Sequence, residues 1–262
     1  MLKTILKLSG TKCVMIMKML YRLRSVILVA TLMLVSGCAE YPSSGSGSGS
    51  GAMLNITMSV SGTINPNYFY FVTFNNINDP HGVTGPIPVI APPWGNGFVA
   101  GAATSYVEYS SALPGDGYLL YNFTNSTLQS SSAVGAPSQD TAVQSGGNTI
   151  QFRIPVSELA TSTVNAASTN YIQVNFIATN RIPVNPEDTT PKEFDALGDS
   201  RPGTGQLNDY ITIPTTQSNT YSSTSTGDEP TGDEEVTNGS GGYSPVNDPD
   251  VDISAWSIQV TN

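Results

Sequence analysis

LNITMSVS, residues 54–61, alternates apolar and polar side chains at every position. Because successive side chains of a β-strand point to opposite faces of the sheet, this period of two predicts a strand with one face in a core and the other in water. Residues 149–154 alternate in the same way. Residues 171–178 read YIQVNFIA and predict another strand, with its mostly polar residues opposite its apolar ones. Residues 68–74 read YFYFVTF, an aromatic and β-branched run that predicts a central strand covered on both faces.

A hairpin is predicted in the middle of the chain. Residues 106–109 and 118–123 are strand-like and flank the turn PGDG at 114–117, whose glycines permit positive φ. Other elements predicted are an edge strand or extended loop at 83–94, one helical turn at 155–160, and a strand at 209–214.

The last strand is predicted over residues 251–260. Its apolar side chains switch faces between Ala255 and Trp256, because Val251 and Ile253 share one face whereas Trp256 and Ile258 share the other. An extra residue in the strand restores the inward direction, so we predict a β-bulge at this point.

Composition agrees with a strand-rich fold. Charged residues make up 11% of the chain, and abundant Ser, Thr, Asn and Gly favour turns and exposed strands over surface helices. We predict an all-β fold, an antiparallel, jelly-roll-like β-sandwich of about eight or more strands. It forms one domain over residues 54–262, with a polar loop at 130–147, a long excursion at 179–208 and a disordered acidic loop at 215–244.

The first 37 residues have the plan of a secretory signal peptide. Positive charges at Lys18, Arg22 and Arg24 precede the apolar run 25–35. This run is too short for a membrane span, which needs about 20 apolar residues. A normal signal would begin at Met17 or Met19, either of which is an alternative start of the protein.

The junction Val35-Ser36-Gly37-Cys38 resembles the lipobox of bacterial lipoproteins. In that family leucine is commonest where Val35 stands, and the cysteine is lipidated and becomes the new N-terminus. The resemblance implies a membrane anchor on Cys38 and a location in the cell envelope. Residues 38–53 then form a Gly/Ser-rich tether. Ala39 is not the aspartate that retains enteric lipoproteins at the inner membrane, so the outer membrane is favoured in a Gram-negative host.

Charge separates the signal from the domain. Six of the 10 Lys and Arg precede Cys38 and all 20 Asp and Glu follow it, so the chain after Cys38 carries 4 − 20 = −16. A field of this sign repels nucleic acid, which we exclude as a partner. With Cys38 lipidated and Cys13 removed, no cysteine pair remains for a disulfide or a zinc site.

Four segments of the second half of the domain carry a further pattern: 150–159, 171–179, 195–198 and 209–213. Together they resemble DOMON-like and family 9 carbohydrate-binding sandwiches, and the resemblance covers about a quarter of the chain. It implies a jelly-roll-like sandwich whose ligand is a sugar, or in some members haem. No ligand residue of those families has a counterpart here.

Aromatic residues suggest a glycan site. Trp94 lies in the loop PPWGNGF at 92–98, together with Phe98, and Tyr106 follows soon after. Exposed rings suit a glycan because their negative faces stack on the weakly positive C–H groups of a sugar. The alternative, which we favour, is that Trp94 folds back onto the sandwich core and the tyrosines pack within the sheet.

Late aspartates suggest a cation site. Asp248, Asp250 and Asp252 supply the hard oxygens that calcium prefers. They have no EF-hand spacing, so the favoured alternative is a solvated strand face next to an acidic loop.

Three functions stay open. The first is a non-catalytic β-sandwich, tethered to a membrane, that binds a glycan or another envelope component. The second is a structural or interaction lipoprotein without a small ligand. The third and least favoured is a glycan hydrolase, since the single histidine, His81, lies in a turn and no carboxylate pair stands out among so many acids. We expect the protein not to be an enzyme.

Overall fold

The computed structural model describes residues 51–81, 84–160, 169–197, 210–226, 232–237 and 242–262. The chain divides into two units, residues 1–49 and residues 50–262. The signal segment, Cys38 and most of the tether lie outside the described residues. Within the described ranges, no helix has the length and apolar character to cross a membrane.

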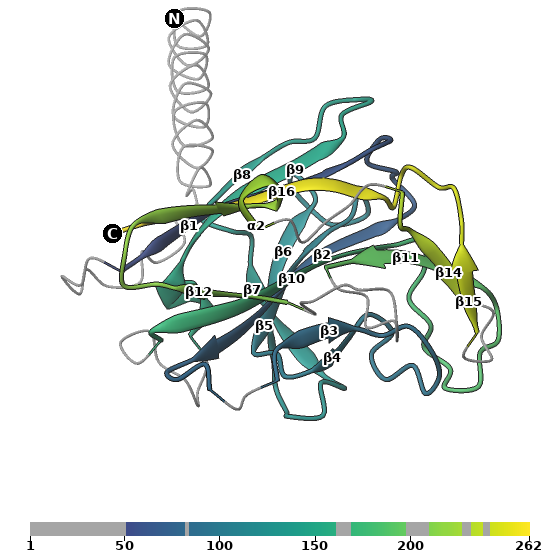
Figure 1. The fold of residues 1–262 in the computed structure, drawn as a ribbon, viewed down its shortest axis with the longest axis horizontal. Coiled ribbons are helices and arrows are strands. Elements are labelled where there is room, and N and C mark those ends of the chain that lie inside the picture. Colours follow the sequence, from purple (N-terminus) through teal and green to yellow (C-terminus); the bar gives the residue numbers. More distant parts are fainter. Residues whose placement is uncertain (1–50, 82–83, 161–168, 198–209, 227–231, 238–241) are drawn as a thin grey trace, which may run out of the picture. The chain divides into compact units, whose positions relative to one another are not determined.

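The domain is an antiparallel β-sandwich, which confirms the predicted fold class (Figure 1). One sheet has five strands. Their order is β13 (Asn219–Ser222), β16 (Ile253–Thr261), β1 (Met53–Val60), β9 (Thr149–Pro155) and β8 (Gln139–Thr141).

The second sheet has nine strands. Along its main path they are β15 (Tyr243–Pro245), β14 (Glu235–Thr237), β11 (Lys192–Ala196), β10 (Tyr171–Thr179), β2 (Phe69–Ile77), β5 (Ser105–Tyr109), β6 (Tyr118–Phe123) and β7 (Ser131–Gly135), and β12 (Ile211–Pro214) also pairs with β10. A separate hairpin joins β3 (Pro86–Pro88) to β4 (Val99–Gly101). The only described helices are a 3-10 turn at Val156–Leu159 and the short α2 at Ser223–Thr226.

The main core lies between the two sheets and follows the predicted alternation. In β1, the side chains of Leu54, Ile56, Met58 and Val60 are fully buried, and those between them are half-buried. Strands β9 and β16 continue this apolar face on either side of β1. The hairpin β5–β6 forms as predicted, with positive φ at Gly115 and Gly117 of its turn.

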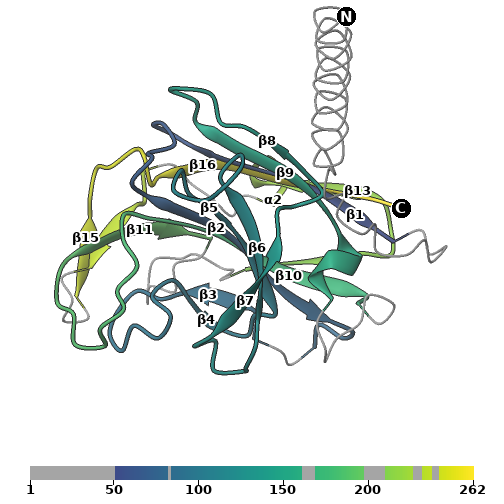
Figure 2. The same ribbon diagram turned by 180° about the vertical axis from the view of Figure 1, so that it is seen from behind.

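A second apolar layer covers the outer face of the nine-stranded sheet. Strands β2 and β10 are buried on both faces over nearly their whole length, as predicted for 68–74. The β3–β4 hairpin lies against this outer face, away from the five-stranded sheet, in both views (Figures 1 and 2). Asn175 of β10 ties the layers together by donating to the carbonyl of Pro86 at 3.0 Å.

The predicted β-bulge is present, one residue earlier than expected. Ser59 pairs with Ala255 and Val60 pairs with Ile253, so Ser254 is the extra residue. As a result Ile253 and Trp256 both face the core although three positions separate them.

Two stretches expected to be loops contain strands. The polar loop at 130–147 contributes β7 and β8, and the excursion at 179–208 contributes β11. The acidic stretch 215–244, expected to be disordered, contains β13, β14 and the start of β15 in its described part. These strands have three to five residues each, too few to show a periodic pattern, so the sequence does not reveal them.

Candidate functional site

Two hollows lie on the outer faces of the sandwich, one on each sheet. The first, which we call the aromatic pocket, has a volume of ≈ 410 Å³ and lies on the nine-stranded sheet. The second, the polar hollow, has a volume of ≈ 660 Å³ and lies on the five-stranded sheet. They share no lining residue.

The aromatic pocket is built on strand β5. Tyr106 and Glu108 are two residues apart, so both side chains point to the outer face of the sheet. The ring of Phe98 packs edge-on against Tyr106 at 5.0 Å between centroids, and stacks on Phe71 of β2 at 4.1 Å. Phe123 of β6 lies 5.1 Å from Tyr106. Four rings therefore form the floor of the pocket.

The loop before β4 forms one wall of this pocket. The side chain of Asn96 accepts hydrogen bonds from the backbone N–H groups of Phe98 and Val99 at 3.1 and 2.9 Å, and donates to the carbonyl of Leu128 at 3.0 Å. Gly97 has φ +90°, and a Cβ there would meet Ile182 Cγ2 at 2.5 Å. Only glycine fits this close approach. It brings the loop against residues 182–184, which form another wall of the pocket.

Glu108 is the distinctive polar group of the pocket. Burial raises the pKa of its carboxyl above the ordinary value of 4.5. Its carboxylate forms no ion pair or hydrogen bond with any residue that the structure describes. Tyr106 is different, because its hydroxyl shares a 2.9 Å hydrogen bond with Ser131 and burial raises its pKa to about 12. Glu108 is thus a partly desolvated acceptor with unused hydrogen-bonding capacity.

The structure separates the three aromatic residues predicted for a glycan site. Phe98 and Tyr106 line the aromatic pocket, with exposed fractions of 5% and 6%. Trp94 does not line it and is 1% exposed, so neither ring face can stack on a sugar. Its indole N–H donates to the carbonyl of Asp188 at 2.7 Å. Trp94 is therefore not an exposed ring, and its burial agrees with the alternative of a folded-back ring.

A buried lysine lies beneath Trp94. Lys192 of β11 donates from Nζ to the carbonyls of Val89 and Gly97 at 2.8 and 2.9 Å. Its Nζ is 5.9 Å from the centre of the Trp94 ring, at cation–π distance. Burial, and to a lesser extent the charge of Arg181, lowers the pKa of Lys192 to about 7. The lysine fastens both ends of the loop that carries Trp94.

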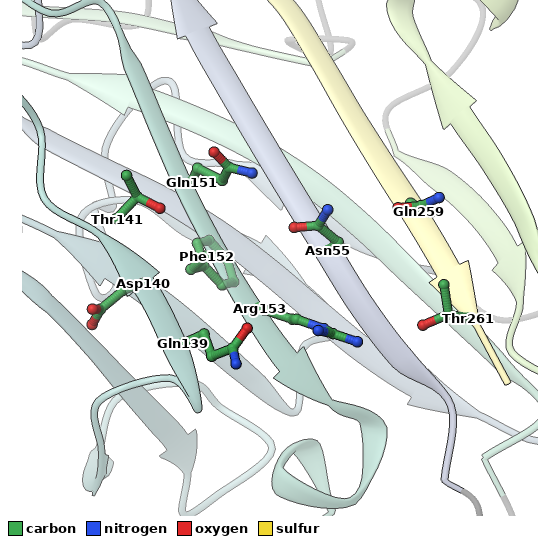
Figure 3. Close-up of a pocket in the computed structure, with 9 residues that line it drawn as sticks. All are labelled: Asn55, Gln139, Asp140, Thr141, Gln151, Phe152, Arg153, Gln259 and Thr261. Carbon is green, nitrogen blue, oxygen red and sulfur yellow. The ribbon is translucent and has the colours of Figure 1, made fainter.

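The polar hollow lies across four strands of the five-stranded sheet (Figure 3). Its lining is dominated by amides and hydroxyls, with one arginine and one aspartate: Asn55, Gln139, Asp140, Thr141, Gln151, Phe152, Arg153, Gln259 and Thr261. Phe152 lies behind the sheet and belongs to the core. The hollow therefore offers hydrogen-bonding groups and no aromatic surface.

One row of side chains crosses the hollow. Register places Gln139 opposite Arg153, Arg153 opposite Asn55, and Asn55 opposite Gln259. Neighbouring members are thus on adjacent strands, about 4.8 Å apart. In the next row Thr57 and Ser257 share a 2.6 Å hydrogen bond between hydroxyls. The four members of the first row form no side-chain hydrogen bond with the described residues.

The late aspartates do not form one set of metal ligands. Asp250 accepts hydrogen bonds from the Thr63 N–H at 2.8 Å and the Asn65 side chain at 3.1 Å, and Asp248 accepts from the Tyr68 hydroxyl at 2.8 Å. These two carboxylates hold the turn after β1. The structure therefore does not bring Asp248, Asp250 and Asp252 together as the predicted set of calcium ligands.

Asp252 instead joins Asp195 and Asp233. One carboxylate oxygen from each lies within 4.8 Å of the other two, close enough for a shared cation. Asp195 also accepts the N–H of Ile253 at 2.6 Å, and Asp252 accepts the Ser61 hydroxyl at 2.6 Å. Both are almost fully buried. Asp195 is on β11, whereas Asp233 and Asp252 lie just before β14 and β16. Segments far apart in the chain bring these acids together, so their sequence spacing carries no metal-site signal.

The residues that sequence reasoning missed are Glu108 and Arg153. Both lie on predicted strands, Glu108 on the first strand of the hairpin and Arg153 on the alternating strand 149–154, and both have the outward parity of their strand. A charged residue among outward-facing aromatic or amide side chains was a usable signal. Arg181 offers a contrast to Arg153, because it pairs with Asp188 and lowers the pKa of that carboxyl to about 2.

Comparisons with protein-family models, curated proteins and solved structures found no match to this chain.

Proposed function

We propose that this chain is a bacterial lipoprotein of the cell envelope whose β-sandwich binds a glycan in the aromatic pocket without catalysis. The lipobox-like sequence ending in Cys38 and the Gly/Ser tether support the anchor. The tether holds the domain away from the membrane, and the outer membrane is the favoured site in a Gram-negative host. The alternative is a structural envelope lipoprotein without a small ligand.

The observation that supports glycan binding most directly is the carboxylate of Glu108 among the aromatic rings of the pocket. A sugar presents C–H groups that suit the partly exposed ring of Phe123, and hydroxyls that can donate to a carboxylate. The carboxylate of Glu108 is partly shielded from water, which strengthens any hydrogen bond it accepts from a ligand. Gln129 and Ser130 add amide and hydroxyl groups at the rim.

The pocket composition favours binding over hydrolysis. Glycoside hydrolysis commonly needs two carboxyl groups, about 5 to 9.5 Å apart. Glu108 is the single carboxylate among the described residues that line the aromatic pocket. A lone carboxylate can orient a sugar, whereas the second acid or base of a hydrolase would have to come from elsewhere.

A glycan-array screen tests the proposal. The lipid-free chain from Ala39 to Asn262 is applied with calcium and with a chelator, because Asp195, Asp233 and Asp252 could hold a cation. We expect a glycan whose affinity, measured by titration calorimetry, falls about 10- to 100-fold in Glu108→Gln, since a hydrogen bond to a charged group contributes about 1.5–3 kcal/mol.

Glu158→Gln is the matched control. Burial raises the pKa of the Glu158 carboxyl as well, but this residue lies outside both hollows. Its affinity should equal that of the wild type. No bound glycan in either condition, or equal losses in the two variants, would contradict the proposed site and favour the structural alternative.

The anchor has its own test. Expressed in a bacterial host with labelled palmitate, the wild type should incorporate label into the mature chain, and Cys38→Ser should not. Label in the Cys38→Ser variant, or none in the wild type, would contradict lipidation at this residue.

A further inference from the structure

Arg153 stands apart from the other cationic residues of the mature chain. Arg181 forms an ion pair with Asp188, Lys192 is fully buried, and Arg201 lies outside the described residues. Arg153 is exposed, and no described carboxylate lies within ion-pair distance of it. In a chain with 20 acidic and four basic residues after Cys38, an arginine that avoids every described carboxylate calls for a physical reason.

The reason lies in its neighbours in the polar hollow. Across the strands, Arg153 faces the neutral amides of Asn55 and Gln139. The nearest acid in the lining, Asp140, is opposite Phe152 and so belongs to the other parity of its strand. Burial and the neighbouring Asp116 raise the pKa of Asp140, which places its carboxyl near Asp116. Figure 3 shows Asp140 and Arg153 directed apart.

We propose that the polar hollow is a second ligand site, which binds a saccharide that carries a carboxylate. The guanidinium fork of Arg153 matches a carboxylate with two parallel hydrogen bonds. The amides of Asn55, Gln151 and Gln259 each both donate and accept, as sugar hydroxyls do. The row crosses the strands, so a chain of sugars lying along it meets one amide or the guanidinium on each strand.

An acidic peptide fits this surface less well. Extended peptides are recognised chiefly by main-chain hydrogen bonds at an open strand edge. Three of the four strands beneath the hollow, β1, β9 and β16, are paired on both sides, and β8 forms the edge of the sheet. The row from Arg153 to Gln259 lies on the face of the paired strands, which offers side chains alone. This site does not depend on the aromatic pocket, because the two hollows lie on different sheets.

Calorimetric titration of the lipid-free chain from Ala39 tests the site. The probes are trisaccharides of galacturonate, glucuronate and mannuronate, each beside its carboxyl-reduced form, with triglutamate as the peptide acid. Salt at about 0.15 M keeps the Debye length near 8 Å, which screens the long-range repulsion of the acidic domain. We expect at least one uronate to bind at least about 10-fold more tightly than its reduced form and than triglutamate.

Arg153→Gln should abolish the preference for the acid, and Arg153→Lys should keep part of it as a point charge without the fork. Arg181→Gln is the matched control, because it makes the same change in net charge in the loop after β10, outside the polar hollow, and should keep the full preference. Near-UV circular dichroism checks that each variant is folded.

Four results would overturn the proposal: no uronate binding, equal binding of acid and reduced forms, triglutamate binding as tight as the best uronate, or an acid preference that survives in Arg153→Gln. Loss of the preference in both arginine variants would also overturn it, by assigning the effect to net charge. None of these outcomes bears on Glu108, so failure here is distinguishable from failure of the aromatic pocket.

Discussion

The two sheets of this sandwich share one core but differ on their outer faces. The outward side chains of β1 remain half-exposed, whereas β2 has eight of its nine residues buried. On the nine-stranded sheet the β3–β4 hairpin and the loops beside it add a second apolar layer. The comparison shows how a ligand site can arise in two ways: as a row of side chains on a bare face, or as a gap within a covering layer.

The chemistry of the two faces follows from this difference. The covered face holds groups whose pKa values burial shifts, Glu108 and Tyr106 upward and Lys192 downward. The open face holds amides and hydroxyls in water. Substitutions should therefore affect folding strongly on the covered face and weakly on the open one.

The largest effect is expected for Trp94→Ala. The ring is fully buried in the covering layer, so its loss should lower the free energy of unfolding by about 3–5 kcal/mol, measured by urea denaturation. Trp94→Phe, which keeps a ring but loses the hydrogen bond to Asp188, should cost less. A cost below about 1 kcal/mol for Trp94→Ala would show that the covering layer contributes little to stability.

Next in size is a pH effect of Lys192. Its pKa is about 7 when folded, against an ordinary value of 10.5. Between these values the unfolded chain binds more protons than the native one, so the free energy of unfolding should rise with pH in this window. Urea denaturation between about pH 7 and 9.5 measures the rise, below the range where buried Tyr70 and Tyr118, with raised pKa values, oppose it.

Lys192→Met should remove this rise, because methionine has no proton to lose. Arg153→Met, which replaces a cation on the open face, should keep the pH profile of the wild type. Parallel profiles for the wild type and Lys192→Met would mean that Lys192 titrates normally and that the covering layer is wet at this point.

The smallest expected effect is the difference in stability cost between replacing an asparagine on the covered face and one on the open face. Asn175 of β10 is fully buried and donates to the carbonyls of Pro86 and Leu197 at 3.0 and 3.1 Å. Asn175→Ala should cost about 1–3 kcal/mol, since it leaves buried carbonyls unsatisfied. Asn55→Ala on the open face should stay within about 0.5 kcal/mol of the wild type in the same urea assay. Equal losses of unfolding free energy in the two variants would contradict the proposed difference between the covered and the open face.

Sequence patterns anticipated the long strands but only some of the short ones, such as β12. The alternation in 54–61 and 149–154 identifies β1 and β9 because each is long enough to show a period. Strands β8 and β14 have three residues each, and their partners β9 and β11 supply the hydrogen bonds that define them. The bulge was anticipated because three apolar residues after it had to return to the core.

The candidate sites were anticipated only in part. Phe98 and Tyr106 were identified from their chemistry, and they do share a pocket. The sequence could not show that Trp94 lies outside this pocket, because its hydrogen-bond partner, Asp188, is 94 residues away. Asp252 was one of three candidate calcium ligands, but the acids that the structure places beside it, Asp195 and Asp233, come from other parts of the chain.

Taken alone, the amino-acid sequence specifies the fold class, the inward face of each long strand and the distribution of charge, because these depend on local periodicity and composition. Long-range packing settles which outward face stays bare and which is covered. An outward-facing side chain of an alternating strand can be half-exposed, as at Asn55, or buried beneath a hairpin, as at Asn175. That choice depends on contacts between segments far apart in the chain, and it places Glu108 and Arg153 in two different hollows.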